Sequence, residues 1–505
     1  MKVLTAAEMR DVDRRTTEAG IPGIALMENA GGRVVDFLVE RFSPLGAQRI
    51  VILCGKGNNG GDGMVVARQL FTRFPGLWLR VVLLADPADL KGDAAANYRM
   101  LQACGCPILR GVPADAICAT VVVDAVLGTG IAGPPSGVAM EGIREINSAS
   151  PFAKVVAVDM PSGMASDAGD SPGEVARADH TVTFTAPKLG QVLPPNCDRT
   201  GELIVVPIGS PAELYAGAKV ELIEPSMFRA LLAPRPKWGH KGTFGHALIV
   251  AGSRGKTGAA VMSGTAALRA GAGLATVASA AGAVPTIAAH TPELMTVPLA
   301  ETESGGISRA ADIPALAKGK TVLAMGPGLG REPDIAELVT RAAAEFEGPA
   351  VFDADALWNW KPFRAGKHPR ILTPHPGEMA HLTGRSTKEI QDDRLAAARA
   401  FAVEHQVILV LKGQRTLIGF PDGRVFVNPT GTPALGTGGT GDILTGLIAG
   451  LLAQFPQKPA ESVAAAVYLG GLAGEIGARE IGEKSFMATD ILRYLPAAIE
   501  RCVAG

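Results

Sequence analysis

The sequence predicts an α/β protein built from two doubly wound domains. At 505 residues, the chain exceeds the roughly 250 to 300 residues that one hydrophobic core serves before a chain divides. A hydrophobic share of 47%, 62 glycines and only 19% charged residues are typical of tightly packed strands and helices joined by glycine-rich turns. Short β-branched runs alternate with helical stretches, and this alternation indicates parallel sheets.

The N-terminal part predicts two helices and then a parallel sheet. Helical patterns cover residues 5–18 and 23–41, and short runs rich in β-branched residues follow them. The strands that we expect are 49–54, 79–84, 120–124, 155–158, 181–184 and 203–207. Their order along the chain favours a doubly wound sheet.

A second domain begins after a stretch in which the pattern loosens. Four prolines fall between residues 209 and 236, and a new alternation starts at residues 246–250. We therefore expect domains over 1–213 and 225–505. The strands expected in the second are 246–250, 321–325, 350–353, 407–412 and 424–428, with helices over 259–270 and 442–452.

Composition and charge argue against nucleic acid and membrane partners. The formal net charge of -1 gives no basic field for a phosphate backbone. No apolar run reaches the roughly 18 residues that a spanning helix needs, and residues 1–10 lack the apolar core of a signal peptide. We expect a cytoplasmic protein with small-molecule partners, and both sheets have edges through which a homo-oligomer could assemble.

The six cysteines are scattered, with no CxxC pair and no histidine at zinc-finger spacing. In a long chain this predicts reduced, buried thiols. The alternative is that Cys104 and Cys106 bind a metal or each other.

The run Gly438-Gly439-Thr440-Gly441-Asp442 in the C-terminal half leads directly into an apolar helical pattern. Backbone N–H groups at such a helix start can bind an anion, and Asp442 can take a proton from an attacking hydroxyl. The alternative is an ordinary glycine-rich loop in which Asp442 is the helix N-cap. A second run, 252–257, resembles a Walker A loop, but that motif needs glycine where the chain has Val250.

The order of the C-terminal motifs resembles the ribokinase-like superfamily and, within it, the ADP/ATP-dependent NAD(P)H-hydrate dehydratases. The similarity runs from about residue 225 to the C-terminus, on motifs at 258–260, 326–330, 353–357, 373–378, 412–416 and 439–442. It implies that nucleotide is bound by Lys412, Gly413, Gln414, Arg415, Thr416 and Gly441. It implies hydrate contacts at Ala259, Gly328, His375 and Asp442, with ADP and Mg²⁺ as partners.

The implied chemistry makes a poor leaving group into a good one. Phosphorylation of the ring hydroxyl, with Asp442 as the base, allows the ring nitrogen's electron pair to expel phosphate. His375 has a structural alternative, a hydrogen-bonded turn between two prolines. Asp353 and Asp355 have the alternative of capping the helix that follows, and for Asp353 we favour it.

The N-terminal half carries its own glycine-rich loop, residues 55–63, before a helix expected at 64–71. Gly55, Gly57 and Gly60 have the spacing GxGxxG, which is typical of a Rossmann-like, phosphate-binding sheet. Hydride transfer is therefore the second interpretation of this half, and Asp62 could be a helix N-cap. The loops at 124–134, 159–163 and 185–190 follow other strands and bring carboxylate, hydroxyl and backbone oxygens that suit a hard cation.

These loops closely resemble the NAD(P)H-hydrate epimerase family over about residues 5–207. The resemblance implies that the hydrate is bound by Asn58, Asn59, Gly60, Gly61, Asp62, Gly128, Thr129, Gly130, Ile131, Ala132, Gly133, Pro134 and Asp159. It implies a potassium ion on Asn59, Asp124 and Ser162, and Asp159 is the candidate proton-transfer group. Lys188 either approaches the substrate or caps the sheet edge.

Together the halves predict one repair pathway: epimerisation of R and S hydrates (NADHX and NADPHX), then ADP-dependent dehydration of the S form to NAD(P)H, AMP and phosphate. One alternative is a ribokinase-like small-molecule kinase fused to a nucleotide-binding module. Another makes the N-terminal half a non-catalytic binding module.

Overall fold

The computed structural model describes residues 1–131, 133–149, 151–361 and 367–504. The chain divides into two compact units, Met1–Val220 and Glu221–Gly505, called here the N-terminal and C-terminal units. The division falls inside the proline-containing stretch at 209–236 that the sequence marks. None of the helices in the described ranges combines the length and the apolar character needed to cross a bilayer.

A seven-stranded sheet with the order β4-β3-β2-β5-β6-β7-β8 forms the centre of the N-terminal unit. Every paired neighbour in it is parallel. The strands are β2 (Arg49–Cys54), β3 (Trp78–Leu83), β4 (Ile108–Leu109), β5 (Val121–Ala125), β6 (Lys154–Val158), β7 (His180–Phe184) and β8 (Glu202–Val206), and β1 (Lys2–Val3) precedes the first helix. The strand order reverses between β2 and β5, where a doubly wound sheet opens a crevice at its carboxyl edge.

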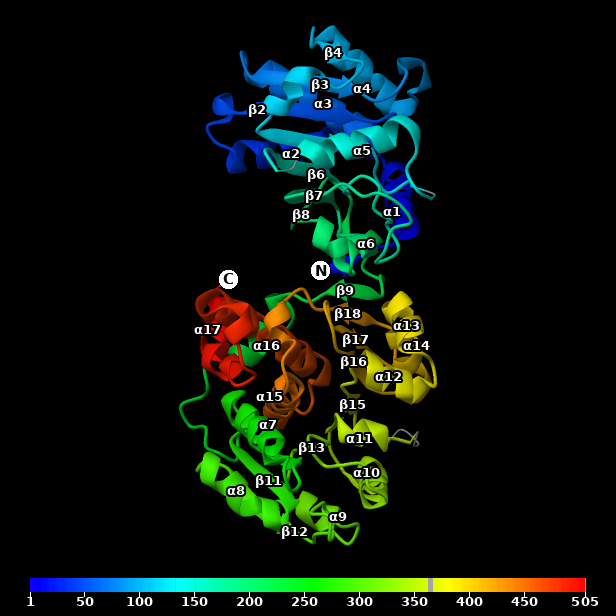
Figure 1. The fold of residues 1–505 in the computed structure, drawn as a ribbon. Coiled ribbons are helices and arrows are strands. Elements are labelled where there is room, and N and C mark those ends of the chain that lie inside the picture. The colour runs from blue at the N-terminus through cyan, green and yellow to red at the C-terminus, as the bar shows by residue number, and fades with distance from the viewer. Residues whose placement is uncertain (132, 150, 362–366, 505) are drawn as a thin grey trace. The chain divides into compact units, whose positions relative to one another are not determined.

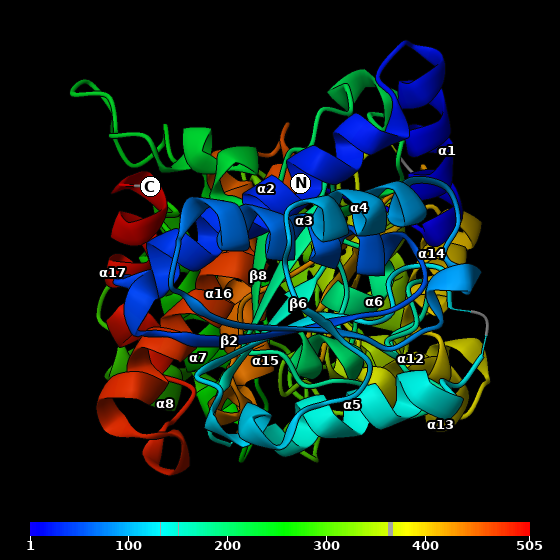
Figure 2. The same ribbon diagram turned by 90° about the horizontal axis from the view of Figure 1, so that it is seen from above.

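Helices cover both faces of this sheet (Figures 1 and 2). Figure 2 shows α2 (Gly23–Arg41), α3 (Asn58–Arg73) and α4 (Gly92–Ala103) along one face and α5 (Gly137–Ala149) along the other. Two more helices are α1 (Ala6–Glu18) and the short α6 (Leu189–Val192). Helix α1 starts where the sequence predicts, because Thr5 and Glu8 form a capping box with hydrogen bonds of 3.1 and 2.8 Å.

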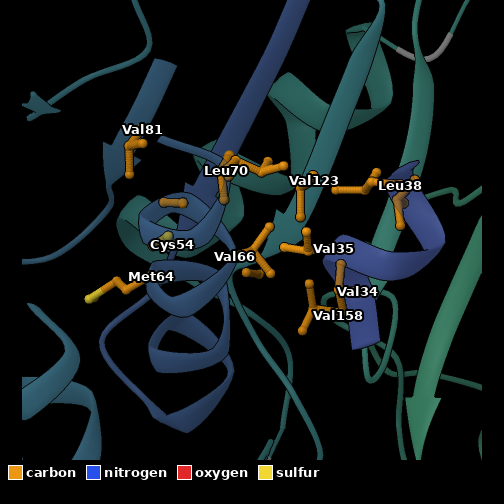
Figure 3. Packing of buried hydrophobic residues seen from close by; sticks show 14 of the residues in the cluster. Val34, Val35, Leu38, Cys54, Met64, Val66, Leu70, Val81, Val123 and Val158 are labelled. Atoms are coloured by element: carbon orange, nitrogen blue, oxygen red, sulfur yellow. The ribbon is translucent and has the colours of Figure 1, made fainter. Parts of the chain in front are cut away.

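One core cluster of this unit lies between the sheet and the pair α2–α3, and another includes Ile143 and Ile146 of α5. Figure 3 shows Val35 of α2 and Val66 of α3 packed toward Val123 of β5, with Leu38 and Leu70 one turn farther along their helices. This spacing of three to four residues places one apolar stripe of each helix on the strands. The packing fixes the start of α3 against the ends of β2 and β5.

Helix α3 begins at Asn58 rather than at Met64 as expected. A Cβ atom on Gly60 would lie 1.9 Å from the carbonyl oxygen of Gly55, so only glycine lets the helix start this close to the strand end. The N-cap is Gly57. The alternative role of Asp62 as N-cap is therefore wrong, since Asp62 lies inside the helix.

The C-terminal unit is built on a sheet whose order runs β9-β18-β17-β16-β15-β14-β13-β10-β11-β12. The pairs from β12 to β16 are parallel, while β16–β17 and β17–β18 are antiparallel. The strands are β9 (Val220–Leu222), β10 (His246–Val250), β11 (Leu274–Ala280), β12 (Met295–Leu299), β13 (Val322–Met325), β14 (Ala350–Phe352), β15 (Arg370–Leu372), β16 (Ile408–Leu411), β17 (Leu417–Gly419) and β18 (Val425–Val427). The sequence analysis missed β9, β11, β12, β15 and β17.

Helices flank this sheet on two sides (Figure 1). One group is α7 (Thr257–Arg269), α8 (Val284–His290), α15 (Thr440–Gln454), α16 (Pro459–Ile481) and α17 (Asp490–Ala504). The other is α9 (Ile313–Ala317), α10 (Pro333–Glu345), α11 (Asp355–Trp358), α12 (Pro376–Thr383), α13 (Thr387–Asp392) and α14 (Arg394–His405). Both units are thus α/β folds, as the sequence predicts: the N-terminal sheet is parallel, and the C-terminal sheet is parallel from β12 to β16.

Candidate active sites

In the N-terminal unit, the candidate residues meet at the carboxyl edge where the strand order reverses. Asn59 and Asp62 lie in the first turns of α3 and are 7% and 9% exposed. Asn59 packs beside the loop after β5, because a Cβ on Gly128 would lie 3.2 Å from that of Asn59. The structure therefore brings together two of the three predicted hydrate-binding segments.

Asp124 and Ser162 form a fully buried pair next to this edge. The Ser162 backbone N–H and hydroxyl donate to the two carboxylate oxygens of Asp124 at 2.8 and 2.5 Å. Burial raises the pKa of Asp124 to about 6, although hydrogen bonds from Ser162 and Val126 act in the opposite direction. A cation beside this carboxylate would favour its ionised form.

The donor set predicted for potassium fits such an ion. Asn59, Asp124 and Ser162 offer one carboxylate and neutral oxygens, which suit a hard cation of low charge. The side-chain Nδ2 of Asn59 is buried and has no hydrogen-bond partner among the described residues, so this amide has a donor free for an oxygen of a bound ligand. Across the described ranges, no group of three or more His, Cys, Asp or Glu side chains could hold a metal ion.

Asp159 follows β6 and lies in a left-handed conformation, with φ of 60°. Its Oδ1 accepts hydrogen bonds from Lys188 Nζ at 2.5 Å, Thr183 Oγ1 at 3.0 Å and the Phe184 N–H at 3.2 Å. The sequence analysis leaves Lys188 open between approaching the substrate and capping the sheet edge, and in the structure its ammonium binds Asp159. It misses Thr183, whose polar side chain is hidden in a strand pattern. Parallel pairing of β6 with β7 is what brings these residues to Asp159.

The remaining predicted hydrate contacts differ in their exposure. Asn58 is exposed, Gly60 and Gly61 are buried in α3, and Gly130, Gly133 and Pro134 are exposed in the loop after β5. Thr129 fixes that loop, since its carbonyl accepts from Ser166 Oγ at 3.2 Å. Ile131 is half-buried, and Ala132 falls outside the described residues.

In the C-terminal unit, the predicted anion site is the start of α15. The N-cap is Gly439 in a left-handed conformation, with φ of 96°, and Asp442 is the third residue of the helix. The alternative of Asp442 as N-cap is therefore wrong. Among the described residues, no atom outside the adjoining chain lies within 4 Å of the place where a Cβ on Gly438 would stand, which leaves room for an anion beside this helix start.

Asp442 has the titration behaviour of a base near neutral pH. Burial raises its pKa to about 7; the carboxylate of Asp353 adds to the rise and the ammonium of Lys412 opposes it. A general base is most effective when its pKa lies near the working pH. Asp442 can therefore accept a proton from a hydroxyl brought to the anion site.

A buried network beneath Asp442 holds the two charges that tune it. Asp353 accepts hydrogen bonds from Thr373 Oγ1 at 2.7 Å, Lys412 Nζ at 2.8 Å and Thr445 Oγ1 at 2.8 Å. Burial lowers the pKa of Lys412, but the carboxylates of Asp353 and Glu378 raise it overall. The preferred expectation that Asp353 caps a helix is wrong, because the N-cap of α11 is Ala354.

The predicted nucleotide loop, 412–416, is held from behind by an arginine that the sequence analysis misses. Arg394 donates to the carbonyls of Gln414 at 2.5 Å and Lys412 at 3.3 Å. Inside the loop, Thr416 Oγ1 donates to the Gly413 carbonyl at 2.9 Å. Arg415 has φ of 54° and donates to the Pro429 carbonyl at 3.1 Å. The Lys412 side chain points inward to Asp353. Gly441 lies next to this side chain, since a Cβ on Gly441 would be 3.3 Å from Lys412 Nζ.

The predicted hydrate contacts of this unit lie in the first turn of α7, in the loop after β13 and at the N-cap of α12. A Cβ on Gly328 would lie 3.1 Å from Cβ of Ala259, so these two positions adjoin. His375 caps α12: its Nδ1 accepts from the N–H groups of Gly377 and Glu378 at 3.0 and 3.2 Å. The structural alternative for His375 is thus present, and its exposed ring leaves substrate contact open.

Asp355, the first residue of α11, binds the loop after β13 and does not cap α11 from the N-cap position, which Ala354 occupies. Its carboxylate accepts from the Gly330 N–H at 2.8 Å and Arg331 Nε at 3.1 Å. The alternative of an N-cap role is therefore wrong for Asp355 too.

Comparisons with known proteins agree with the division of the chain into two units, each with its own site. Residues 247–497 match the family model described as NAD(P)H-hydrate dehydratase, and residues 23–190 match the YjeF-related protein N-terminus. A bifunctional NAD(P)H-hydrate repair enzyme of Moorella thermoacetica is 44% identical, over 98% of this chain and 96% of the relative. The chain belongs to the bifunctional NAD(P)H-hydrate repair enzymes. A relative of the same name from Coxiella burnetii is 37% identical, over 97% of each chain.

Solved structures resemble the C-terminal unit of this family member. The ADP/ATP-dependent NAD(P)H-hydrate dehydratase of Bacillus subtilis, co-crystallised with ATP and Mg²⁺, is 33% identical with a TM-score of 0.50. The match covers 56% of this chain and 99% of that one. A ribokinase-like superfamily protein of Enterococcus faecalis is 27% identical with the same TM-score, over 57% and 98%. Both predicted resemblances are confirmed, and the hydride-transfer interpretation is set aside.

Proposed function

We propose that this protein restores hydrated NADH and NADPH in two steps. The N-terminal domain, residues 1–213, interconverts the R and S hydrates. The C-terminal domain, residues 225–505, dehydrates the S hydrate with ADP and releases AMP and phosphate. The observation that carries the proposal is Asp442, a carboxyl with a pKa of about 7 at the open, glycine-rich start of α15.

The second step balances as a phosphorylation followed by an elimination. The hydroxyl oxygen of the hydrate attacks the terminal phosphorus of ADP, AMP leaves, and Asp442 takes the hydroxyl proton. The ring nitrogen's electron pair then expels phosphate, and loss of a ring proton restores the double bond of NAD(P)H. The N–H groups of the Gly438–Gly441 turn would stabilise the charge on the transferred group, and Mg²⁺ bound with the nucleotide would neutralise its phosphates.

The residues carried over by resemblance complete this proposal. Backbone groups of Lys412, Gly413, Gln414, Arg415, Thr416 and Gly441 would hold the nucleotide. Ala259, Gly328 and His375 would contact the hydrate. The Lys412 side chain would not bind the nucleotide but would pair with Asp353 and so influence the pKa of Asp442. In the N-terminal site, α3 and the loop after β5 would hold the hydrate against Asp159.

The test supplies purified protein with a mixture of both hydrate epimers and either ADP or ATP. Absorbance reports reduced nicotinamide and phosphorus NMR reports the nucleotide products. We expect complete recovery of NAD(P)H with stoichiometric AMP and phosphate from ADP. A stable phosphorylated hydrate without recovery would instead indicate a small-molecule kinase.

Dehydration should fall in acid because Asp442 must be ionised to act. Its folded-state pKa is raised to about 7, so the active form is lost as pH falls through 7. We expect kcat/KM to drop about tenfold per pH unit below that point. Asp353→Asn removes a carboxylate that raises this pKa and should move the midpoint to lower pH; an unmoved midpoint would contradict the assignment.

Potassium should stabilise the N-terminal unit. We propose that Asn59, Asp124 and Ser162 hold the ion beside the hydrate, where it would favour ionised Asp124. A ligand at ten times its Kd stabilises the folded state by about 1.4 kcal/mol, so the unfolding temperature of this unit should rise in potassium relative to choline chloride. The rise should disappear in Asn59→Leu, and an equal rise in that variant would refute the site.

Thiol chemistry supports a cytoplasmic location as part of the proposal. All six cysteines are free, and Cys104 and Cys118 are exposed, which suits a reducing compartment. The expectation that all were buried is wrong for these two, and Cys104 and Cys106 form no disulfide.

We also propose assembly into a homo-oligomer, which sedimentation of the full chain tests.

A further inference from the structure

Lys188 carries a buried charge that the carried-over site residues leave unexplained. Its side chain is 1% exposed and is among the largest of the fully buried side chains. An ammonium has three hydrogens, and three acceptors surround this one: Asp159 Oδ1 at 2.5 Å, Thr183 Oγ1 at 2.9 Å and the Phe184 carbonyl at 3.2 Å. No donor of Lys188 is left for a bound hydrate.

Asp159 lies in a strained turn that directs its carboxylate. With φ of 60° and a hydrogen bond of 2.7 Å from the Met160 N–H to the Val158 carbonyl, it is the centre of a γ-turn. Such a conformation costs about 1–3 kcal/mol outside glycine and persists where the surroundings enforce it. Oδ1 takes all three donors described above, and no residue in the described ranges donates to Oδ2.

A second turn of the same kind seats the lysine. Thr185 has φ of 67°, and the Ala186 N–H donates to the Phe184 carbonyl at 2.7 Å. This turn folds the chain so that Lys188 reaches back to that carbonyl. Gln191 then ties the two segments together, accepting from the Lys188 N–H at 2.7 Å and donating to the Asp159 carbonyl at 2.6 Å.

Two other carboxyls lie within electrostatic reach of this pair. Asp13 of α1 has its pKa raised to about 6 by burial, opposed by Lys188 and reinforced by Asp159. Burial also raises the pKa of Asp62 on α3 well above its ordinary value. Only Asp159 among them hydrogen-bonds the ammonium, so the lysine's charge is directed to the proton-transfer group.

We propose that Lys188 is a positioning residue for epimerisation: by holding Oδ1 of Asp159, together with Thr183, it leaves Oδ2 as the oxygen that exchanges protons with the hydrate. The inference rests on the proposed epimerase function. A buried ion pair often adds little to stability compared with an apolar pair. A buried pair held by two strained turns is therefore better explained by its effect on Asp159.

The test compares Lys188→Met with Lys154→Met, which removes an exposed lysine of β6 paired with Asp179 at 2.6 Å. Epimer exchange is followed by chromatography without ADP, and dehydration of pure S hydrate with ADP reports on the C-terminal unit. We expect Lys188→Met to lower kcat for exchange about 100-fold with KM within about twofold. Lys154→Met should match the wild type, and S-hydrate dehydration should be unchanged in both.

A double variant separates positioning from structure. If Lys188 acts through Asp159, then Lys188→Met should cause no further loss of kcat in an Asp159→Asn background. Additive losses, a change in KM alone, or a wild-type rate in Lys188→Met would each overturn the inference. Should Lys188→Met fail to fold, Thr183→Val tests the same oxygen, and an unchanged kcat in it would overturn the inference. Failure of the wild type to exchange epimers would instead refute the proposed function itself.

Discussion

Replacing Asp442 by asparagine is expected to slow ADP-dependent dehydration by about 100- to 10,000-fold, the usual contribution of a general base. The amide keeps the size of the carboxyl but cannot take the proton of the attacking hydroxyl. The start of α15 remains in place, because its N-cap is Gly439 and not Asp442. Residual activity should therefore reflect the open backbone N–H groups and the bound nucleotide.

The measurement is single-turnover conversion of S hydrate at saturating ADP. Asp392→Asn is a matched control, since that carboxylate lies 59% exposed on α13 and pairs only with Lys388 among the described residues. Epimer exchange in the N-terminal unit should be the same in wild type and both variants. Dehydration at the wild-type rate in Asp442→Asn would show that another group removes the proton.

Regular strands and glycine-rich motifs were predictable because their signals are local. Strand β2 and helix α2 have the predicted bounds, since a β-branched run and a 3.6-residue apolar period each lie within one segment. Strands β15 and β17 have three residues each. Such short runs carry no period, and the neighbouring strands supply most of what holds them in the sheet.

The start of α3 could not be predicted from propensity. Asn58, Asn59, Gly60 and Gly61 are poor helix formers, so the sequence favours a loop there. Tertiary packing decides otherwise, because the glycines allow the helix to abut the end of β2. The consequence for the site is direct: the predicted hydrate-binding residues are a helix start, with N–H groups aligned toward the crevice.

Partners within the sites were hidden for a different reason. Asp353 meets Thr373, Lys412 and Thr445, which lie 20, 59 and 92 residues away in the chain. Only the parallel order of β14, β15 and β16 and the packing of α15 bring them together. The sequence predicted Asp442 as a candidate base, but the network that raises its pKa needed the fold.

Replacing Asp159 by asparagine should abolish most epimer exchange, by about 100- to 10,000-fold, while leaving S-hydrate dehydration intact. With mixed epimers and excess ADP, recovery of NAD(P)H should then stop once the S form is consumed, and the R form should remain. Chromatography of the remaining hydrate checks this directly. Complete recovery at the wild-type rate would mean that a group other than Asp159 exchanges the proton.

The same substitution should also destabilise the N-terminal unit, which distinguishes it from Asp442→Asn. It leaves the buried ammonium of Lys188 without a charged partner, and breaking a buried ion pair costs about 3–5 kcal/mol. Adding Lys188→Met removes that uncompensated charge, so the unfolding temperature of this unit should rise again in calorimetry. Epimer exchange should not return with it, because stability depends on balancing the charge whereas catalysis depends on the carboxylate.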